Sequence, residues 1–186
     1  MRSEEIPAWC FLTGQFLIGF DRNKKSRTPN YISVHNDFLK STETDPPLED
    51  FYYVNPGIVI MLCYGLLVYS VEYWDSFLRD EINMKRLNKG IIAAAYQMGV
   101  SVSTFIELFR IIVWKGDTSE STFIRKLRNA IAHSHIDVDE RHSEYTYRNV
   151  NRSQDVDFEI SVSTENLGIF LTGLGRHFSG GQRRNR

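Results

Sequence analysis

The sequence predicts an all-α protein, built as a helical bundle that carries one small β-hairpin near its C-terminus. After Pro56, most apolar residues recur at spacings of three and four, as in helices that bury one face. Between residues 144 and 162 the spacing changes to two, which is typical of strands. A chain of 186 residues that is 42% hydrophobic can bury one substantial core. We therefore expect one helical domain with short appendages.

The first 55 residues are expected to form a helix followed by a long polar connection. Apolar residues fall mostly at helical spacing over residues 8–20, whereas residues 21–50 are rich in charge and interrupted by prolines. Glu4 and Glu5 precede the first apolar stretch, and an acidic start is the wrong charge for a signal peptide. We expect no export.

Residues 56–84 are expected to form one long helix, because Pro56 suits a first helical turn and an apolar stripe follows it. The uncharged stretch 51–71 is about as long as a membrane span, which leaves a transmembrane helix as the alternative. Gly57 and Gly65 shorten the continuous apolar helix to roughly 15 residues, fewer than the roughly 20 that a bilayer needs. We therefore favour a buried helix and expect no membrane partner.

Two further helical segments are expected before residue 117. One covers residues 90–98 and breaks near Gly99. The next restarts with Thr104 as N-cap, because Glu107 three residues later completes a capping box, and it ends at Gly116.

Asp117 and Glu120 repeat that capping pattern ahead of a helix with apolar residues at Phe123, Ile124, Leu127 and Ile131. This helix carries the run from Arg128 to His135. Arginine keeps its charge and histidine titrates near neutrality, so the pair suits gripping a phosphate and moving a proton. At about 100° per residue, His133 lies roughly 140° from Arg128, a gap that a long arginine can cover if the helix ends near His133. The alternative is structural: Arg128 pairs with an acid and His133 caps the helix.

A hairpin and a closing helix are expected after this run. Two strands flank a polar turn at residues 151–154, and Thr164 can cap a last helix that reaches Phe178. Residues 179–186 form a basic tail that we expect to be disordered.

The run resembles the motif of the HEPN superfamily, an all-α group with an Arg-x4-6-His motif near the end of a late helix. Arg128 and His133 match the four-residue spacing, and Asn129 matches the polar second position. His135 satisfies the six-residue spacing, so either histidine can belong to the motif. The resemblance covers residues 56–178 and includes the hairpin and closing helix of one HEPN subgroup. It predicts a HEPN-like helical bundle.

The resemblance implies a metal-independent endoribonuclease without a cofactor, of the toxin–antitoxin or anti-phage defence type, working as a homodimer. His133 would transfer protons, Arg128 would stabilise the phosphorane oxygens and Asn129 would orient the site, with His135 as the possible substitute. Arg125 and Lys126 would help to bind RNA. An antitoxin or a sensor protein is a further possible partner. The alternative is a non-catalytic module of this fold that binds RNA, a nucleotide or a partner protein.

Composition and cysteine content bear on three other properties of the protein, namely nucleic-acid binding, cellular compartment and metal binding. A net charge of −1 does not mark the whole chain as a nucleic-acid binder, so a basic groove must be local. Cys10 and Cys63 stand in apolar runs, where reduced buried thiols and a cytoplasmic protein are expected. Potential metal ligands cluster between residues 133 and 142, but their spacing matches no known site. On one helix, His133 and His135 would point roughly 200° apart, so we expect no metal.

Overall fold

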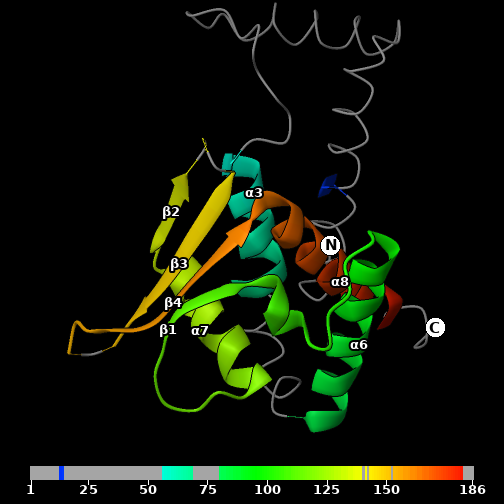
Figure 1. Ribbon diagram of the computed structural model, residues 1–186, viewed down its shortest axis with the longest axis horizontal. Helices are drawn as coiled ribbons and strands as arrows, with labels where there is room; N and C mark the ends of the chain where they lie inside the picture. The colour runs from blue at the N-terminus through cyan, green and yellow to red at the C-terminus, as the bar shows by residue number, and fades with distance from the viewer. Residues whose placement is uncertain are drawn as a thin grey trace, which may run out of the picture.

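In the computed structural model, a four-stranded antiparallel sheet packs against helices (Figure 1). The structure describes residues 13–14, 56–68, 80–139, 141, 143–151 and 153–181. Thr13 and Gly14 are helical and belong to the predicted first helix. The rest of that helix, the predicted connection at 21–50 and the tail beyond residue 181 lie outside the described residues.

The predicted all-α class is wrong, because the protein is an α+β fold. The strands are ordered β1-β4-β3-β2 in the sheet. Their bounds are Arg110–Trp114 for β1, Ile136–Asp139 for β2, Glu144–Val150 for β3 and Val156–Ser163 for β4. The predicted hairpin is confirmed as β3 and β4, and one further strand pairs with each of its outer edges. A sheet of this size is a layer of the core, not an appendage of a helical bundle.

Strand β1 occupies a segment for which the sequence predicts a helix. Thr104 accepts a hydrogen bond from Ile106, as expected of an N-cap, but only one 3-10 turn follows, at Phe105–Leu108. The carboxylate of Glu107 accepts from Ser103. The chain then extends as Arg-Ile-Ile-Val-Trp, a run of β-branched and aromatic residues that pairs with β4. Pairing with β4 therefore prevails over the local helical signal.

The predicted long helix 56–84 is interrupted. Helix α3 covers Pro56–Cys63 and continues as a π-helix at Tyr64–Val68, while residues 69–79 lie outside the described part. Asp80 is extended and its side chain accepts a hydrogen bond from the Ile82 amide, so it caps a new helix, α6, at Glu81–Gln97. Helix α6 runs without interruption through Gly90, where the sequence predicts a boundary. The predicted break at Gly99 is confirmed by its φ of +80°.

The core lies between the sheet and the helices. Helix α7, at Glu120–Ala132, packs along β3, and α8, at Thr164–Gly181, packs against α6 (Figure 1). Aromatic rings fill the centre: Phe123 contacts Phe105, Phe109 and Phe158 edge to face, with centroid distances of 5.0–5.7 Å. Phe123, in the first turn of α7, is fully buried. This aromatic cluster fixes the helix that carries the Arg-His run against the sheet.

Among the helices that the structure describes, none combines the length and the apolar character required to cross a bilayer.

Candidate active site

Helix α7 begins at a polar cap that differs by two residues from the predicted one. Ser119, not Asp117, is the N-cap, and its hydroxyl accepts a hydrogen bond from the Thr122 amide at 3.3 Å. Asp117 accepts from the hydroxyls of Thr122 and Ser119, and these hydrogen bonds lower the pKa of its carboxyl below 3.8. Glu120 bridges to Asn88 of α6 and to Thr104. The start of α7 is thus fixed to the neighbouring elements.

The middle of α7 has the predicted burial pattern. Phe123, Ile124, Leu127 and Ile131 are buried, together with Ala130. Arg128 and Asn129 are half-buried beside this stripe. The Nη1 atom of Arg128 donates a hydrogen bond to Oδ1 of Asn129 at 3.0 Å. The polar second position of the run therefore orients the guanidinium group.

The end of α7 is a Schellman turn. His133 is the C-cap, and Ser134 adopts the left-handed conformation with a φ of +56°. The Ser134 amide donates to Ile131 O at 3.1 Å and the His135 amide to Ala130 O at 2.8 Å. The Arg148 amide of β3 donates to His135 O at 3.0 Å. Helix and sheet thus both hold the backbone of His135.

This turn brings the two candidate histidines together. The ring centroids of His133 and His135 are 6.0 Å apart with an interplanar angle of 35°, and both residues are exposed. The divergence of about 200° expected for a continuous helix does not occur, because α7 ends at Ala132. Two imidazoles, able to accept and donate protons, stand next to each other at an exposed helix end, with Arg128 one to two turns earlier on the same helix.

A family model described as HEPN pEK499 p136 matches residues 15–179 of the chain. The chain belongs to this HEPN family. No curated protein and no solved structure matches it. The match spans α3 to α8, so it includes α7 and the turn that follows. HEPN domains commonly dimerise and act on RNA, and membership supports a ribonuclease-like module.

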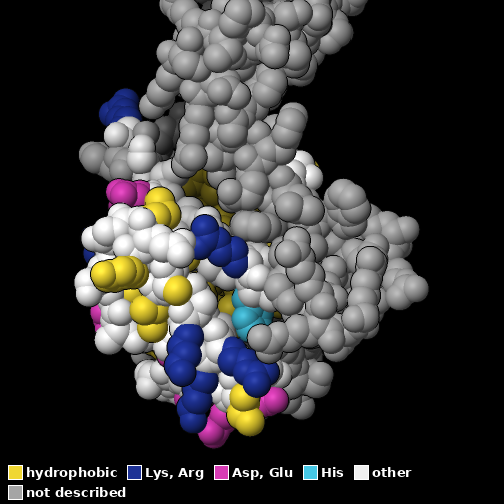
Figure 2. Space-filling view, turned by 90° about the vertical axis from the view of Figure 1, so that its right-hand side faces the viewer, with side chains coloured by type: hydrophobic (Ala, Val, Ile, Leu, Met, Phe, Trp, Pro, Cys, Tyr) yellow, Lys and Arg dark blue, Asp and Glu magenta, His cyan; other side chains and the backbone are white. Residues whose placement is uncertain are grey.

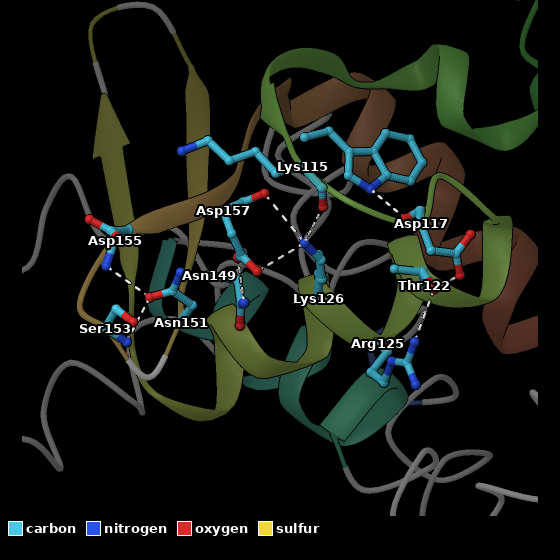
Figure 3. Close-up of polar contacts among 11 residues, drawn as sticks. Lys115, Asp117, Thr122, Arg125, Lys126, Asn149, Asn151, Ser153, Asp155 and Asp157 are labelled. Carbon is cyan, nitrogen blue, oxygen red and sulfur yellow. Dashed lines mark hydrogen bonds and ion pairs between the residues drawn. The ribbon is translucent and has the colours of Figure 1, made fainter.

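The two other cations predicted at the HEPN site differ in their surroundings (Figure 3). Lys126 Nζ lies 3.0 Å from Oδ2 of Asp157 and donates to Lys115 O at 2.9 Å, and its side chain is only 13% exposed. Its ammonium group is therefore bound within the fold, where it joins α7 to β4. Arg125 is exposed and donates to the Thr122 hydroxyl at 3.0 Å, so its charge faces solvent.

The potential metal ligands after α7 and the thiol of Cys63 were the other reactive groups in the sequence. Within the described residues, no three His, Cys, Asp or Glu side chains are grouped so that they could hold a metal ion, and Glu140 and His142 lie outside that part. Cys63 is buried with its Sγ 3.7 Å from the Tyr147 hydroxyl, and burial raises the pKa of its thiol to about 12. Cys63 is therefore a neutral core thiol.

Sequence reasoning did not single out Ser134. A serine between two histidines carries no recognised turn signal, since glycine or asparagine is the usual residue at this position of a helix end. Its left-handed conformation nevertheless determines where both imidazoles lie.

Proposed function

We propose that the protein is a metal-independent endoribonuclease of the toxin–antitoxin or anti-phage defence type, active as a homodimer. The observation that carries this proposal is the position of the Arg128–His133 run at an exposed helix end in a member of a HEPN family. Attack of a ribose 2′-hydroxyl on its adjacent phosphate needs a proton acceptor, a proton donor and a cation for the phosphorane oxygens. The run contains side chains of all three kinds.

These tasks fall to the side chains of the Arg128–His135 run. One imidazole accepts the 2′-hydroxyl proton as the 2′-oxygen–phosphorus bond forms, and the bond from phosphorus to the 5′-oxygen breaks. The 5′-oxygen receives a proton from the resulting imidazolium, which leaves a 2′,3′-cyclic phosphate and a 5′-hydroxyl. We assign proton transfer to His133, with His135 as its neighbour and possible substitute. Arg128 stabilises the phosphorane charge, and Asn129 holds the guanidinium group.

A second copy completes the site in this proposal. The polar end of α7 is exposed at His133, Ser134 and His135, so a two-fold axis near it would oppose two identical half-sites. The exposed charge of Arg125 would then be doubled along the same cleft and would attract RNA phosphates. Lys126 contributes to the stability of α7 and not to this cleft, because Asp157 neutralises it.

The test is cleavage of a fluorescent RNA in EDTA by the purified protein and by single variants. His133→Ala and Arg128→Lys should each lower the rate by at least about 100-fold, since one general acid–base group or one donor to the transition-state charge contributes about that much. Arg128→Lys keeps a charge at this half-buried position but removes the planar fork of donors. Lys115→Ala is the control, because it removes an exposed cation outside the run.

Three outcomes would overturn the proposal or part of it. Cleavage that EDTA abolishes would contradict the metal-independent mechanism. Full activity in the double variant His133→Ala/His135→Ala would remove histidine from the chemistry. RNA binding without cleavage by the wild type would make this chain a non-catalytic module of the HEPN fold.

A further inference from the structure

Helix α6 has an exposed face that combines cations with apolar side chains. Its buried stripe consists of Met84, Leu87, Ile91, Ala94 and Ala95. At about 100° per residue, the opposite stripe contains Ile82, Lys85, Arg86, Lys89 and Tyr96. Ile82 is 61% exposed and Tyr96 is 79% exposed. Both side chains are therefore available on the surface of α6, next to the cations of the same stripe.

Helix α8 adds a further cation to this face. A Cβ atom on Gly173 would lie 2.6 Å from Ile91 Cα, so the two helix backbones are in close contact. Arg176 Nη1 reaches across to Gln97 Oε1 at 2.5 Å, and His177 lies close enough to Arg86 for its charge, after burial, to lower the pKa of the imidazole. Figure 2 views this side and shows Lys and Arg side chains gathered around a histidine. We name Lys85, Arg86, Lys89 and Arg176 the α6–α8 basic face.

Few acids balance this face. Glu81 is the single acidic residue of α6, and its carboxylate is 3.8 Å from Lys85 Nζ at the first turn. Glu165, the acid of α8, also stands in the first turn of its helix, three turns before Arg176. In the part of the chain that the structure describes, no carboxylate pairs with Arg86, Lys89 or Arg176. Within that part, these three exposed cations therefore keep an unneutralised charge.

The cations of the sheet have the opposite environment. Arg148 pairs with Glu159 at 3.1 Å and with Asp137, and Arg110 pairs with Glu144 at 3.1 Å. Carboxylates thus outnumber arginines in these clusters on the face of the sheet away from the helices. Among the described residues, the arginines of the sheet are therefore neutralised by carboxylates, whereas Arg86, Lys89 and Arg176 on the α6–α8 side are not.

We propose that the α6–α8 basic face binds the backbone of single-stranded RNA, as a docking surface separate from the α7 site. The cations contact phosphates, and Tyr96 offers an exposed ring on which a base can stack. A cationic surface with an exposed aromatic ring fits a single strand, whose bases are accessible. The ligand class rests on the proposed function, but binding to this face needs no catalytic group.

The experiment measures binding of a fluorescent 2′-O-methyl RNA 12-mer by anisotropy. This probe keeps phosphates and bases but lacks the 2′-hydroxyl, so the proposed reaction cannot cleave it. Lys89→Glu is compared with Lys115→Glu, which makes the same charge change at an exposed lysine outside the face. We expect Lys89→Glu to raise Kd more than Lys115→Glu does, which should raise it by less than about twofold. The double variant Arg86→Glu/Lys89→Glu should raise Kd by at least about tenfold. Tyr96→Ala should raise Kd without changing the salt dependence.

The salt dependence identifies the contacts. Each lost phosphate contact should lower the slope of log Kd against log salt by about 0.7. An equal loss of affinity in Lys115→Glu, or an unchanged slope in the double variant, would overturn the proposal. It would also be overturned if the double variant lost self-association or binding to anionic lipid vesicles while it still bound the 12-mer. If the double variant loses binding to the 12-mer but still cleaves short RNA, the result supports a docking surface separate from the α7 site. If the wild type binds the 12-mer but cleaves no RNA, the result contradicts only the proposed nuclease activity.

Discussion

The imidazole rings of His133 and His135 lie 6.0 Å apart because Ser134 between them is left-handed, with a φ of +56°. A helix that continued through residue 135 would separate the two rings by about 200°. The Schellman turn instead ends α7 at Ala132 and holds His135 by hydrogen bonds to Ala130 and Arg148. The geometry of the proposed site therefore depends on the conformation of one serine.

Substitution of Ser134 should change stability in opposite directions. A left-handed conformation costs a residue with a Cβ roughly 1–2 kcal/mol, and glycine avoids this cost. Ser134→Gly should therefore raise the free energy of unfolding by about 0.5–1 kcal/mol, and Ser134→Val should lower it by about 1–2 kcal/mol. Urea unfolding followed by circular dichroism measures both. A destabilised glycine variant would show that the serine side chain, and not the turn, fixes this position.

The ion pair between Lys126 and Asp157 should contribute to folding. The two side chains are 13% and 22% exposed, and removing one partner leaves the other poorly solvated. We expect Lys126→Met to lower the free energy of unfolding by about 1–3 kcal/mol. Arg125→Met, one residue earlier on the exposed side, should change it by less than about 0.5 kcal/mol. Equal effects of the two variants would mean that the ion pair contributes little.

The same pair predicts a pH dependence of stability. Burial raises the pKa of Asp157, but hydrogen bonds from Asn149 and Lys126 and the lysine charge outweigh it, so the pKa lies below 3.8. A folded-state pKa below the unfolded value stabilises the fold above the unfolded pKa, and this stabilisation is lost as the pH falls through the folded pKa. Asp157→Asn should therefore lose less stability than the wild type between about pH 5 and pH 2. Parallel curves for the two proteins would contradict the assignment.

Two glycines of α8 provide a matched test of the contact between α6 and α8. A Cβ on Gly173 would lie 2.6 Å from Ile91 Cα, whereas a Cβ on Gly168 meets nothing within 4 Å. Gly173→Ala should destabilise the protein by about 1–3 kcal/mol, because a backbone must move. Gly168→Ala should stabilise it by up to about 1 kcal/mol through helix propensity. Thermal unfolding of the two variants distinguishes the effects, and a neutral Gly173→Ala would refute the close packing.

Local sequence patterns predicted α7, α8 and the β3–β4 hairpin, because the apolar residues of each element keep a helical or an alternating period. They did not predict β1 and β2, the strands that change the fold class. The apolar spacing that precedes Arg110 also fits a helix, and the residues that hold β1 extended are in β4, about 50 positions later in the chain. Strand β2 has four residues, which is too short for alternation to stand out, and it exists through its pairing with β3.

The candidate site was predictable to a similar extent. The helical period placed Arg128 beside the buried stripe, where the structure has it half-buried. The proximity of the two histidines was not predictable, because it depends on a left-handed serine. The ion pair of Lys126 was not predictable either, since its partner Asp157 is 31 residues away in sequence. Spacing within one helix carries no information on such contacts.

The measurement that tests the central claim most directly is cleavage of a DNA oligonucleotide that contains one ribonucleotide, in the presence of EDTA. If the 2′-hydroxyl is the nucleophile, the wild-type protein should cut only 3′ of the ribonucleotide and leave a 2′,3′-cyclic phosphate, which mass spectrometry identifies. The His133→Ala variant should leave the oligonucleotide intact. Cutting at deoxyribonucleotides, a product with a 5′-phosphate, or equal cleavage by His133→Ala would contradict the mechanism.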